Sequence, residues 1–357
     1  MKQNVMTVAV LMALIFGFLV FSQLSIAAES FKPVTLKTSM FFASNSWAGK
    51  QYQWWANELT KRTNGRVKVD FFWMDSLVKQ ADMLPGLKTK MTDAGFTTSS
   101  YFPSNLPLFM MIDLLGNAGD DYGAVILASL DTQENEPNLK AELEREGVVM
   151  LAEHLTGFGS IAMGKRVGSF SELKGKTIRT VGAVQNSYFK GLGANPVFMP
   201  YSDIYEAMSR GTVDGFIGAF ALSDSMKHYE VIKSAITFNW QQVTASGVLM
   251  NRNLFLSLPK DIQTIMMDLR KEFASYYSDA VKNDIAGILY KWVYERGINY
   301  IALTPEEKAF NAKLIETTND TFIKEQEAKG NKAARKVWDY YLKSLKRITE
   351  ERAKAKK

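Results

Sequence analysis

Side chains able to do covalent or metal chemistry are few in this chain of 357 residues. It contains no cysteine and two histidines, His154 and His228. No HExxH zinc motif, GxSxG nucleophile elbow or GxxxxGK[ST] phosphate loop occurs. His154 follows Glu153 inside an apolar stretch, which favours a packed, hydrogen-bonded imidazole over a metal ligand. The composition therefore predicts a protein that is not an enzyme, has no metal-ligating residues and uses no cofactor; whether a metal bridges the carboxylate of a ligand stays open.

One charged side chain stands where it could hold a ligand. Arg179 lies near the end of a predicted strand, residues 177–181, in the sequence KTIRT. The planar guanidinium of arginine can donate two parallel hydrogen bonds to one carboxylate. On the residues alone, two roles are open for Arg179: a structural salt bridge, or a clamp for the carboxylate of a ligand.

The segment 170–217 must position this arginine, and it predicts a strand, helix, strand, helix, strand unit. Apolar residues recur at helical spacing from Val184 to Leu192, and Gly191 and Gly193 can end that helix. GLGANP, at 191–196, follows a helix and precedes a strand, the reverse of what a dinucleotide fingerprint requires. Parallel units of this kind bind ligands at the carboxyl ends of their strands.

An earlier segment has a similar pattern. Residues 34–39, 47–59 and 66–73 predict another strand, helix and strand, followed by a helix at 77–90 and a strand from 91. DMLPGLKTKMTDAGF, from Asp82, aligns with DIYEAMSRGTVDGFI, from Asp203, and places Asp93 against Asp214. Two like segments predict two lobes of similar architecture.

Other segments connect or span these lobes. Residues 148–151 and 156–163 predict strands that cross into the second lobe, and 248–250 a strand that crosses back. Helical periodicity extends over 261–296, a length that few compact domains use.

The first residues predict export. A charged start at Lys2, an apolar run from Val8 to Phe21 and small residues at Ala27 and Ala28 are typical of a secretory signal peptide, here residues 1–28. The apolar run is shorter than the roughly 18 residues of a membrane span, the alternative interpretation. The net charge is +6; it would suit anionic ligands, or equally a basic surface of no special purpose. The mixed charges after Lys346 favour a solvated helix end over a nucleic-acid arm.

Several motifs together resemble one family. LKGKTIR, LGANPVFMPYSDIYEAM and GTVDG, with LMNRNLFLSLPKDIQ and GINYIALTPEEKAF further on, are similar to substrate-binding proteins of tripartite ATP-independent periplasmic (TRAP) transporters of the DctP type. The resemblance covers nearly the whole chain after the signal peptide. It implies a periplasmic receptor that captures an organic acid and delivers it to the TRAP permease subunits in the membrane. It also implies that Arg179 forms the bidentate carboxylate clamp.

The expected fold is α/β, a two-lobed periplasmic binding protein fold in which each lobe is a mostly parallel sheet flanked by helices. The resemblance implies that the long helix spans both lobes. The expected boundaries are 1–28 for the signal peptide, 29–155 plus about 245–283 for lobe I, and 156–244 plus about 284–357 for lobe II. No stable membrane insertion is expected after signal cleavage.

Loops that follow strands supply the other candidate ligand-binding residues. Together with Arg179, the predicted site comprises Asn45, Trp73, Tyr101, Phe158, Phe216, Gly218 and Trp240. The chain departs from the family in two places: Gly157-Phe158-Gly159 stands where many members have a second arginine, and Gly218 where they have an asparagine. Fewer polar anchors, and the volume that glycine vacates, predict a monocarboxylate or similar monoanion with an apolar body, which an aromatic ring could supply.

Two other functions stay open. A secreted enzyme could use the same scaffold, and a sensory receptor could pass its ligand-bound state to a signalling kinase. Turnover would distinguish the first, and neighbouring permease genes would argue against the second.

Overall fold

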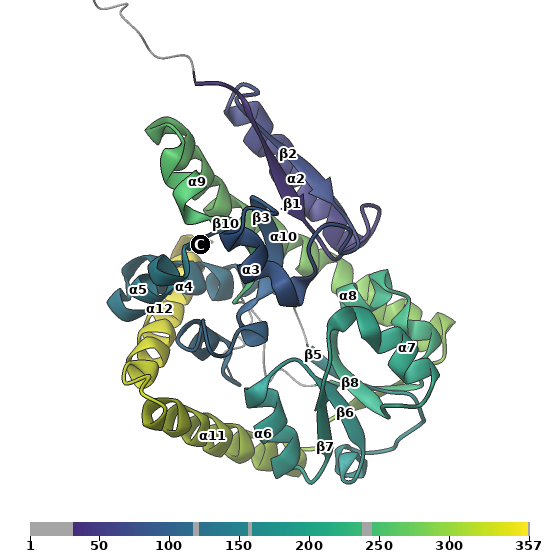
Figure 1. Ribbon diagram of the computed structural model, residues 1–357. Helices are drawn as coiled ribbons and strands as arrows, with labels where there is room; N and C mark the ends of the chain where they lie inside the picture. Colours follow the sequence, from purple (N-terminus) through teal and green to yellow (C-terminus); the bar gives the residue numbers. More distant parts are fainter. Residues whose placement is uncertain (1–30, 117–120, 156–158, 238–244, 356–357) are drawn as a thin grey trace, which may run out of the picture.

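The computed structural model places the chain in two lobes, each built around a β-sheet (Figure 1). It describes residues 31–116, 121–155, 159–237 and 245–355. The predicted signal peptide lies outside these residues. None of the helices within them has the length and apolarity that crossing a membrane requires.

The first sheet has the strand order β2-β1-β3-β10-β4. Its strands are β1 (Val34–Ser39), β2 (Val67–Phe72), β3 (Ala94–Thr98), β4 (Val148–His154) and β10 (Ser246–Asn251). In the described part of this lobe, β10 alone runs against its neighbours. Its helices are α2 (Trp47–Arg62), α3 (Met83–Lys88), α4 (Tyr122–Asn135), α5 (Pro137–Glu146) and α9 (Arg252–Ser257).

The second sheet has the order β11-β9-β5-β8-β6-β7. Its strands are β5 (Gly159–Met163), β6 (Thr177–Thr180), β7 (Asn195–Phe198), β8 (Gly215–Ala219), β9 (Ser234–Thr237) and β11 (Asn299–Ala302). Among the described strands here, β5 is the reversed one. The helices α6 (Ala183–Gly191), α7 (Ile204–Ser209) and α8 (Phe220–Ser225) belong to this lobe. The predicted two-lobed, mostly parallel α/β fold is therefore confirmed.

The reversed strands lie where the chain changes lobe. Strand β4 of the first sheet ends at His154, and the next strand, β5, belongs to the second sheet and begins at Gly159. β9 ends in the second sheet at Thr237, and β10 begins in the first at Ser246. The predicted crossing strands are thus present, and the ends of β4 and β10 lie at the junction of the lobes.

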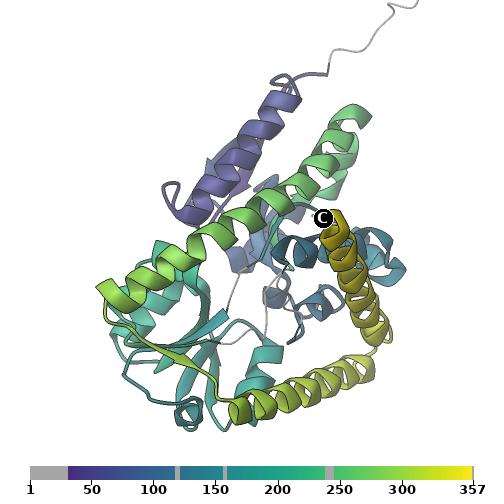
Figure 2. The ribbon, with the colours of Figure 1, turned by 180° about the vertical axis from the view of Figure 1, so that it is seen from behind.

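The long helix α10 (Lys260–Tyr290) packs on both lobes, as Figure 2 shows from behind. It contacts α2, α4 and β4 on one side of the junction and α8 on the other. Leu269, Phe273, Tyr277 and Val281, four residues apart, form its buried face. A π-helical turn, Lys291–Glu295, continues it. At 1.5 Å per residue, α10 is about 45 Å long, enough to brace two lobes.

The predicted internal similarity is confirmed at the two aspartates. The backbone N–H of Lys37 in β1 donates to Asp93 Oδ2 at 2.9 Å, and that of Thr177 in β6 donates to Asp214 Oδ2 at 2.8 Å. Each aspartate therefore fixes the turn before a strand, β3 or β8, to the neighbouring parallel strand. Asp93 and Asp214 therefore make the same hydrogen bond at equivalent positions of the two lobes.

The predicted helix at 77–90 is wrong in its first half. A 3-10 turn, Gln80–Asp82, precedes α3, which begins at Met83. Pro85 explains the difference, because proline lacks an N–H and is tolerated only in the first turn of a helix.

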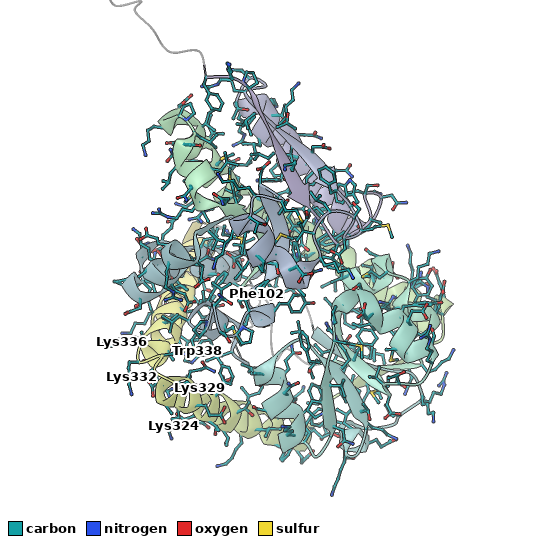
Figure 3. All side chains as sticks on the ribbon, viewed as in Figure 1. Phe102, Lys324, Lys329, Lys332, Lys336 and Trp338 are labelled. Atoms are coloured by element: carbon teal, nitrogen blue, oxygen red, sulfur yellow. The ribbon has the colours of Figure 1, made fainter. Side chains whose placement is uncertain are left out.

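Helices α11 (Pro305–Ala328) and α12 (Ala334–Ala355) form a corner outside the two sheets (Figure 1). α11 packs on α6 of the second lobe, and α12 packs along α4 of the first. Trp338 stacks on Tyr341 within α12, and four exposed lysines, Lys324, Lys329, Lys332 and Lys336, lie along the corner (Figure 3). This part of the positive charge is displayed to solvent.

Candidate functional site

A cavity of about 70 Å³ lies between the two lobes. The first lobe contributes residues from the ends of its strands and the turn before α3: Phe41, Gln80, Phe96, Thr98, His154 and Ser246. The second lobe contributes Gly159, Arg179, Val181, Gln185, Tyr201, Ile217, Gly218, Ala219 and Leu222. This is the crevice at the carboxyl ends of parallel strands that the topology predicts.

Arg179 reaches the cavity from β6 and is 1% exposed. Its Nε donates to the carbonyl oxygen of Met199 at 2.8 Å, and its Nη1 donates to that of Ile217 at 3.4 Å. These carbonyls follow β7 and belong to β8, the two strands that flank β6, so the sheet itself orients the guanidinium. Nη2 forms no hydrogen bond with any described residue.

No described carboxylate forms an ion pair with Arg179, so the structural salt bridge that the sequence left open is absent from this part of the chain. The ring of Tyr201 lies 5.2 Å from the guanidinium carbon, within cation–π distance. Burial lowers the pKa of the Arg179 guanidinium, and the nearby hydroxyls of Tyr101 and Tyr201 partly oppose that shift. A buried cation without a counter-ion is costly unless a ligand supplies the anion.

Apart from Arg179, the lining residues that the structure describes carry no charge. Burial lowers the pKa of His154 to about 3, so this imidazole is neutral near pH 7. The other described lining residues are neutral. Among the described lining residues, Arg179 is the one that is positively charged. The net charge of +6 is therefore not concentrated at this cavity.

Aromatic rings line the cavity on both sides of the junction. Phe41 and Phe96 of the first lobe have ring centroids 5.2 Å apart, and Phe41 approaches Tyr201 of the second lobe at 6.4 Å. The wall is thus apolar around a few polar groups, the composition of a small-molecule site.

Three polar atoms of the lining are buried without a hydrogen-bond partner in the described structure: Arg179 Nη2, Thr98 Oγ1 and Ser246 Oγ. Buried polar groups are nearly always paired in native proteins. All three of these unpaired atoms therefore belong to residues that line one cavity.

The predicted site residues are only partly brought together. Arg179 and Gly218 line the cavity. Tyr101 lies beside Arg179, and its ring meets that of Phe198 at 5.8 Å across the junction. Phe216 is fully buried behind the wall, 5.1 Å from the ring of His228.

The remaining predictions fall elsewhere. Trp73 packs on Phe71 at 4.5 Å, and Asn45 is exposed; neither lines the cavity. Phe158 and Trp240 lie outside the described residues. Position after a strand does not tell which side of a loop faces the junction, and the ligand-binding roles stay predictions.

Gly218 does not vacate volume as the sequence suggested. A Cβ built there would lie 2.6 Å from Phe216 Cε2, 2.8 Å from Ser223 Oγ and 2.9 Å from the Tyr201 hydroxyl oxygen. Tyr201 and Ser223 hydrogen-bond to each other at 2.8 Å. Neighbouring side chains have therefore filled the place of the missing asparagine.

The sequence did not single out Phe41, Gln80, Phe96, Gln185, Tyr201, Leu222 or Ser246, which all line the cavity. It also read His154 as a packed residue, and its Nδ1 does lie 3.3 Å from the Tyr277 hydroxyl oxygen. Ser246 could have been predicted from its position at the start of β10, the strand with which the chain returns to the first lobe.

Comparison with known families identifies one match. The model of the family described as "Bacterial extracellular solute-binding protein, family 7" matches residues 38–325. Most of the chain, including both sheets and α10, lies within this match.

Individual relatives are more distant. The chain is 27% identical over 327 residues to the 2,3-diketo-L-gulonate-binding periplasmic protein YiaO of Escherichia coli, covering 91% of this chain and 95% of the relative. It is 24% identical to the C4-dicarboxylate-binding periplasmic protein DctP of Rhodobacter capsulatus, covering 81% and 86%. A marine metagenome TRAP solute-binding protein, solved in complex with 3-hydroxybenzoate, shares the fold with a TM-score of 0.77 at 19% identity, covering 89% and 99%.

Proposed function

Because the chain belongs to bacterial extracellular solute-binding protein family 7, we propose that it is a periplasmic receptor that captures a monocarboxylate between its lobes and delivers it to the membrane subunits of a TRAP permease. The relatives are solute-binding proteins. The apolar run and small residues before position 29 support export to the periplasm.

The observation that carries the proposal is the unpaired Nη2 of buried Arg179. A carboxylate at this position would receive a charge-assisted hydrogen bond and neutralise the guanidinium. The cavity's single described cation supports one negative charge on the ligand. A second carboxylate would be buried without a counter-ion, a costly arrangement.

The ligand body is proposed to be apolar, and aromatic or branched. Phe41, Phe96, Ile217 and Leu222 form much of the wall, and burial of apolar area against them would supply binding energy. The relatives named for C4-dicarboxylates and 2,3-diketo-L-gulonate bind more polar molecules, so this selectivity would distinguish the present chain from those two relatives.

An acid panel tests the proposal on the mature protein. Aromatic and branched monocarboxylates should raise the melting temperature, whereas succinate, malate and gluconate should not, because a ligand that binds only the native state stabilises it. Stabilisation by the dicarboxylates or the sugar acid alone would contradict the proposed ligand class.

Substitution of Arg179 provides the second test. Arg179→Ala should weaken the best acid by at least about tenfold, and Arg179→Lys should also weaken it because lysine keeps the charge but loses the planar fork. Arg210→Ala is the matched control, since Arg210 is an exposed arginine of the same lobe paired with Glu206. Unchanged affinity for Arg179→Ala in calorimetry would show that Arg179 is a structural residue only.

A further inference from the structure

We propose that Thr98 and Ser246 form a hydroxyl pair that binds a neutral oxygen, a hydroxyl or a carbonyl, at the end of the ligand opposite its carboxylate. The inference rests on the proposed function, because Arg179 must fix the carboxylate end first. It narrows the ligand class to hydroxy- or oxo-substituted monocarboxylates.

The two side chains are neighbours on one face of the first sheet. Ser246 in β10 is directly opposite Thr98 in β3, and His154 in β4 continues the same row. All three line the cavity. Directly opposed residues of antiparallel strands have Cβ atoms about 5 Å apart, so both hydroxyls can reach one ligand atom.

Neither hydroxyl has a structural task in the described part of the protein. Thr98 is 6% exposed and Ser246 is 2% exposed, yet Oγ1 and Oγ form no hydrogen bond, to each other or to any described group. The adjacent residues differ: Thr97 Oγ1 donates to the Gln80 carbonyl oxygen at 2.9 Å, and Ser99 Oγ donates to Asp113 Oδ2 at 3.3 Å. The side chain of Thr98 alternates to the other face of the sheet, where the cavity lies.

An unpaired buried hydroxyl is unfavourable relative to an apolar group of the same shape. Two such hydroxyls side by side, facing a cavity, indicate that a ligand atom pairs with them. A hydroxyl ligand atom can accept from one and donate to the other, and a carbonyl oxygen can accept from both.

The oxygen must be neutral because the described residues of the first lobe place no charge at the cavity. Its described lining residues are aromatic, amide, hydroxyl and imidazole groups, and His154 is neutral near pH 7. Arg179 approaches from the second lobe, so the recognised oxygen lies on the side of the ligand away from the carboxylate.

Acids that differ only by a hydroxyl group test whether Thr98 and Ser246 bind a ligand oxygen. The probes are benzoate with 3- and 4-hydroxybenzoate, and hexanoate with 6-hydroxyhexanoate, measured by calorimetry on the mature protein. At least one hydroxylated acid should bind about tenfold more tightly than its parent. Thr98→Val and Ser246→Ala should each reduce that preference, and the double variant should abolish it.

Stability of the unliganded protein gives a second measurement. Thr98→Val should leave the melting temperature unchanged or raise it, because it removes an unpaired polar atom. Thr132→Val is the matched control: its buried hydroxyl, in α4, donates to the Ala128 carbonyl oxygen, so this variant should melt at a lower temperature. A large loss of stability for Thr98→Val would assign that hydroxyl a structural role and overturn the inference.

The outcomes separate the two proposals. An unchanged hydroxyl preference in the double variant, or parent acids that bind as well as every hydroxylated acid, would overturn this inference while leaving the monocarboxylate receptor intact. Failure of all the acids to bind, or binding that Arg179→Ala does not weaken, would overturn both.

Discussion

At the scale of single residues, the cavity is flanked by buried groups that the protein leaves incompletely bonded. His228 is one of them: it is fully buried, its ring lies 5.3 Å from Tyr201 and 5.1 Å from Phe216, and neither ring nitrogen bonds to a described residue. Burial, and to a lesser extent the charge of Arg179, lowers the pKa of His228 to about 3. An uncharged imidazole is the form that this position tolerates.

This predicts a pH effect that His228→Phe removes. An unfolded histidine titrates near pH 6.5, so between about pH 6.5 and 3 the unfolded chain binds the proton and the folded chain does not. The free energy of unfolding therefore falls as the pH falls through this window, by at most about 1.4 kcal/mol per pH unit for one group. The phenylalanine variant should be less sensitive to acid than the wild type.

Urea unfolding at pH 7 and pH 5, without ligand, measures this difference. Glu142, whose burial raises its pKa to about 7, acts in the opposite direction but is present in both proteins, as is His154. Parallel losses of stability in wild type and variant would show that His228 does not titrate abnormally.

At the scale of elements, the short strand β8 is held in position by close contacts at its glycines, which leave no room for a side chain. In β8, Gly215 packs against Met163, and Gly218 is surrounded by Phe216, Ser223 and Tyr201. In α10 the opposite holds at Gly287, where a Cβ would meet no atom within 4 Å. Two glycines of one protein are therefore present for different reasons.

Replacing each glycine with alanine should give opposite results. Gly218→Ala should lower the free energy of unfolding by about 1 to 3 kcal/mol, because the added methyl displaces buried side chains. Gly287→Ala should raise it by about 0.5 to 1 kcal/mol through helix propensity. Chemical denaturation of both variants measures the pair, and a destabilised Gly287→Ala would show that α10 needs a bend or a close contact at that point.

At the scale of the whole molecule, the lobes meet closely around the cavity. A Cβ on Gly182 of the second lobe would lie 3.0 Å from Ser100 Cβ of the first, and Tyr101 meets Phe198 across the same junction. Two crossing connections, α10 and the α11–α12 corner join the lobes. Such an arrangement permits hinge motion about the connections.

We therefore expect a bound acid to shift an open ensemble towards this closed form. Small-angle scattering should give a smaller radius of gyration with saturating ligand than without it. Gly182→Val is the control, because its side chain should hold the lobes apart and reduce the compaction. An identical radius with and without a tightly bound acid would indicate a preformed pocket.

The sequence by itself determined the fold class, the crossing strands and the long helix. Each depends on local patterns: apolar spacing over 261–296, short β-rich runs, and the paired motifs around Asp93 and Asp214. It also singled out Arg179, which lies in the cavity wall, because it is an arginine at a strand end, where ligands bind in open parallel sheets; its role in ligand binding stays a prediction. The domain boundaries remain a prediction.

Only the tertiary structure decided which other side chains meet. Thr98 and Ser246 are 148 positions apart in the sequence and become neighbours through antiparallel pairing of β10 with β3, a register that no local pattern contains. Trp73 and Asn45 follow strands as Tyr101 does, but neither side chain lines the cavity, although Phe41, in the same loop as Asn45, does. The filled space at Gly218 likewise depends on Tyr201 and Ser223, which reach it from separate elements. Burial and pairing across lobes are long-range properties, so the site's polar atoms could be recognised as unpaired only once their surroundings were in place.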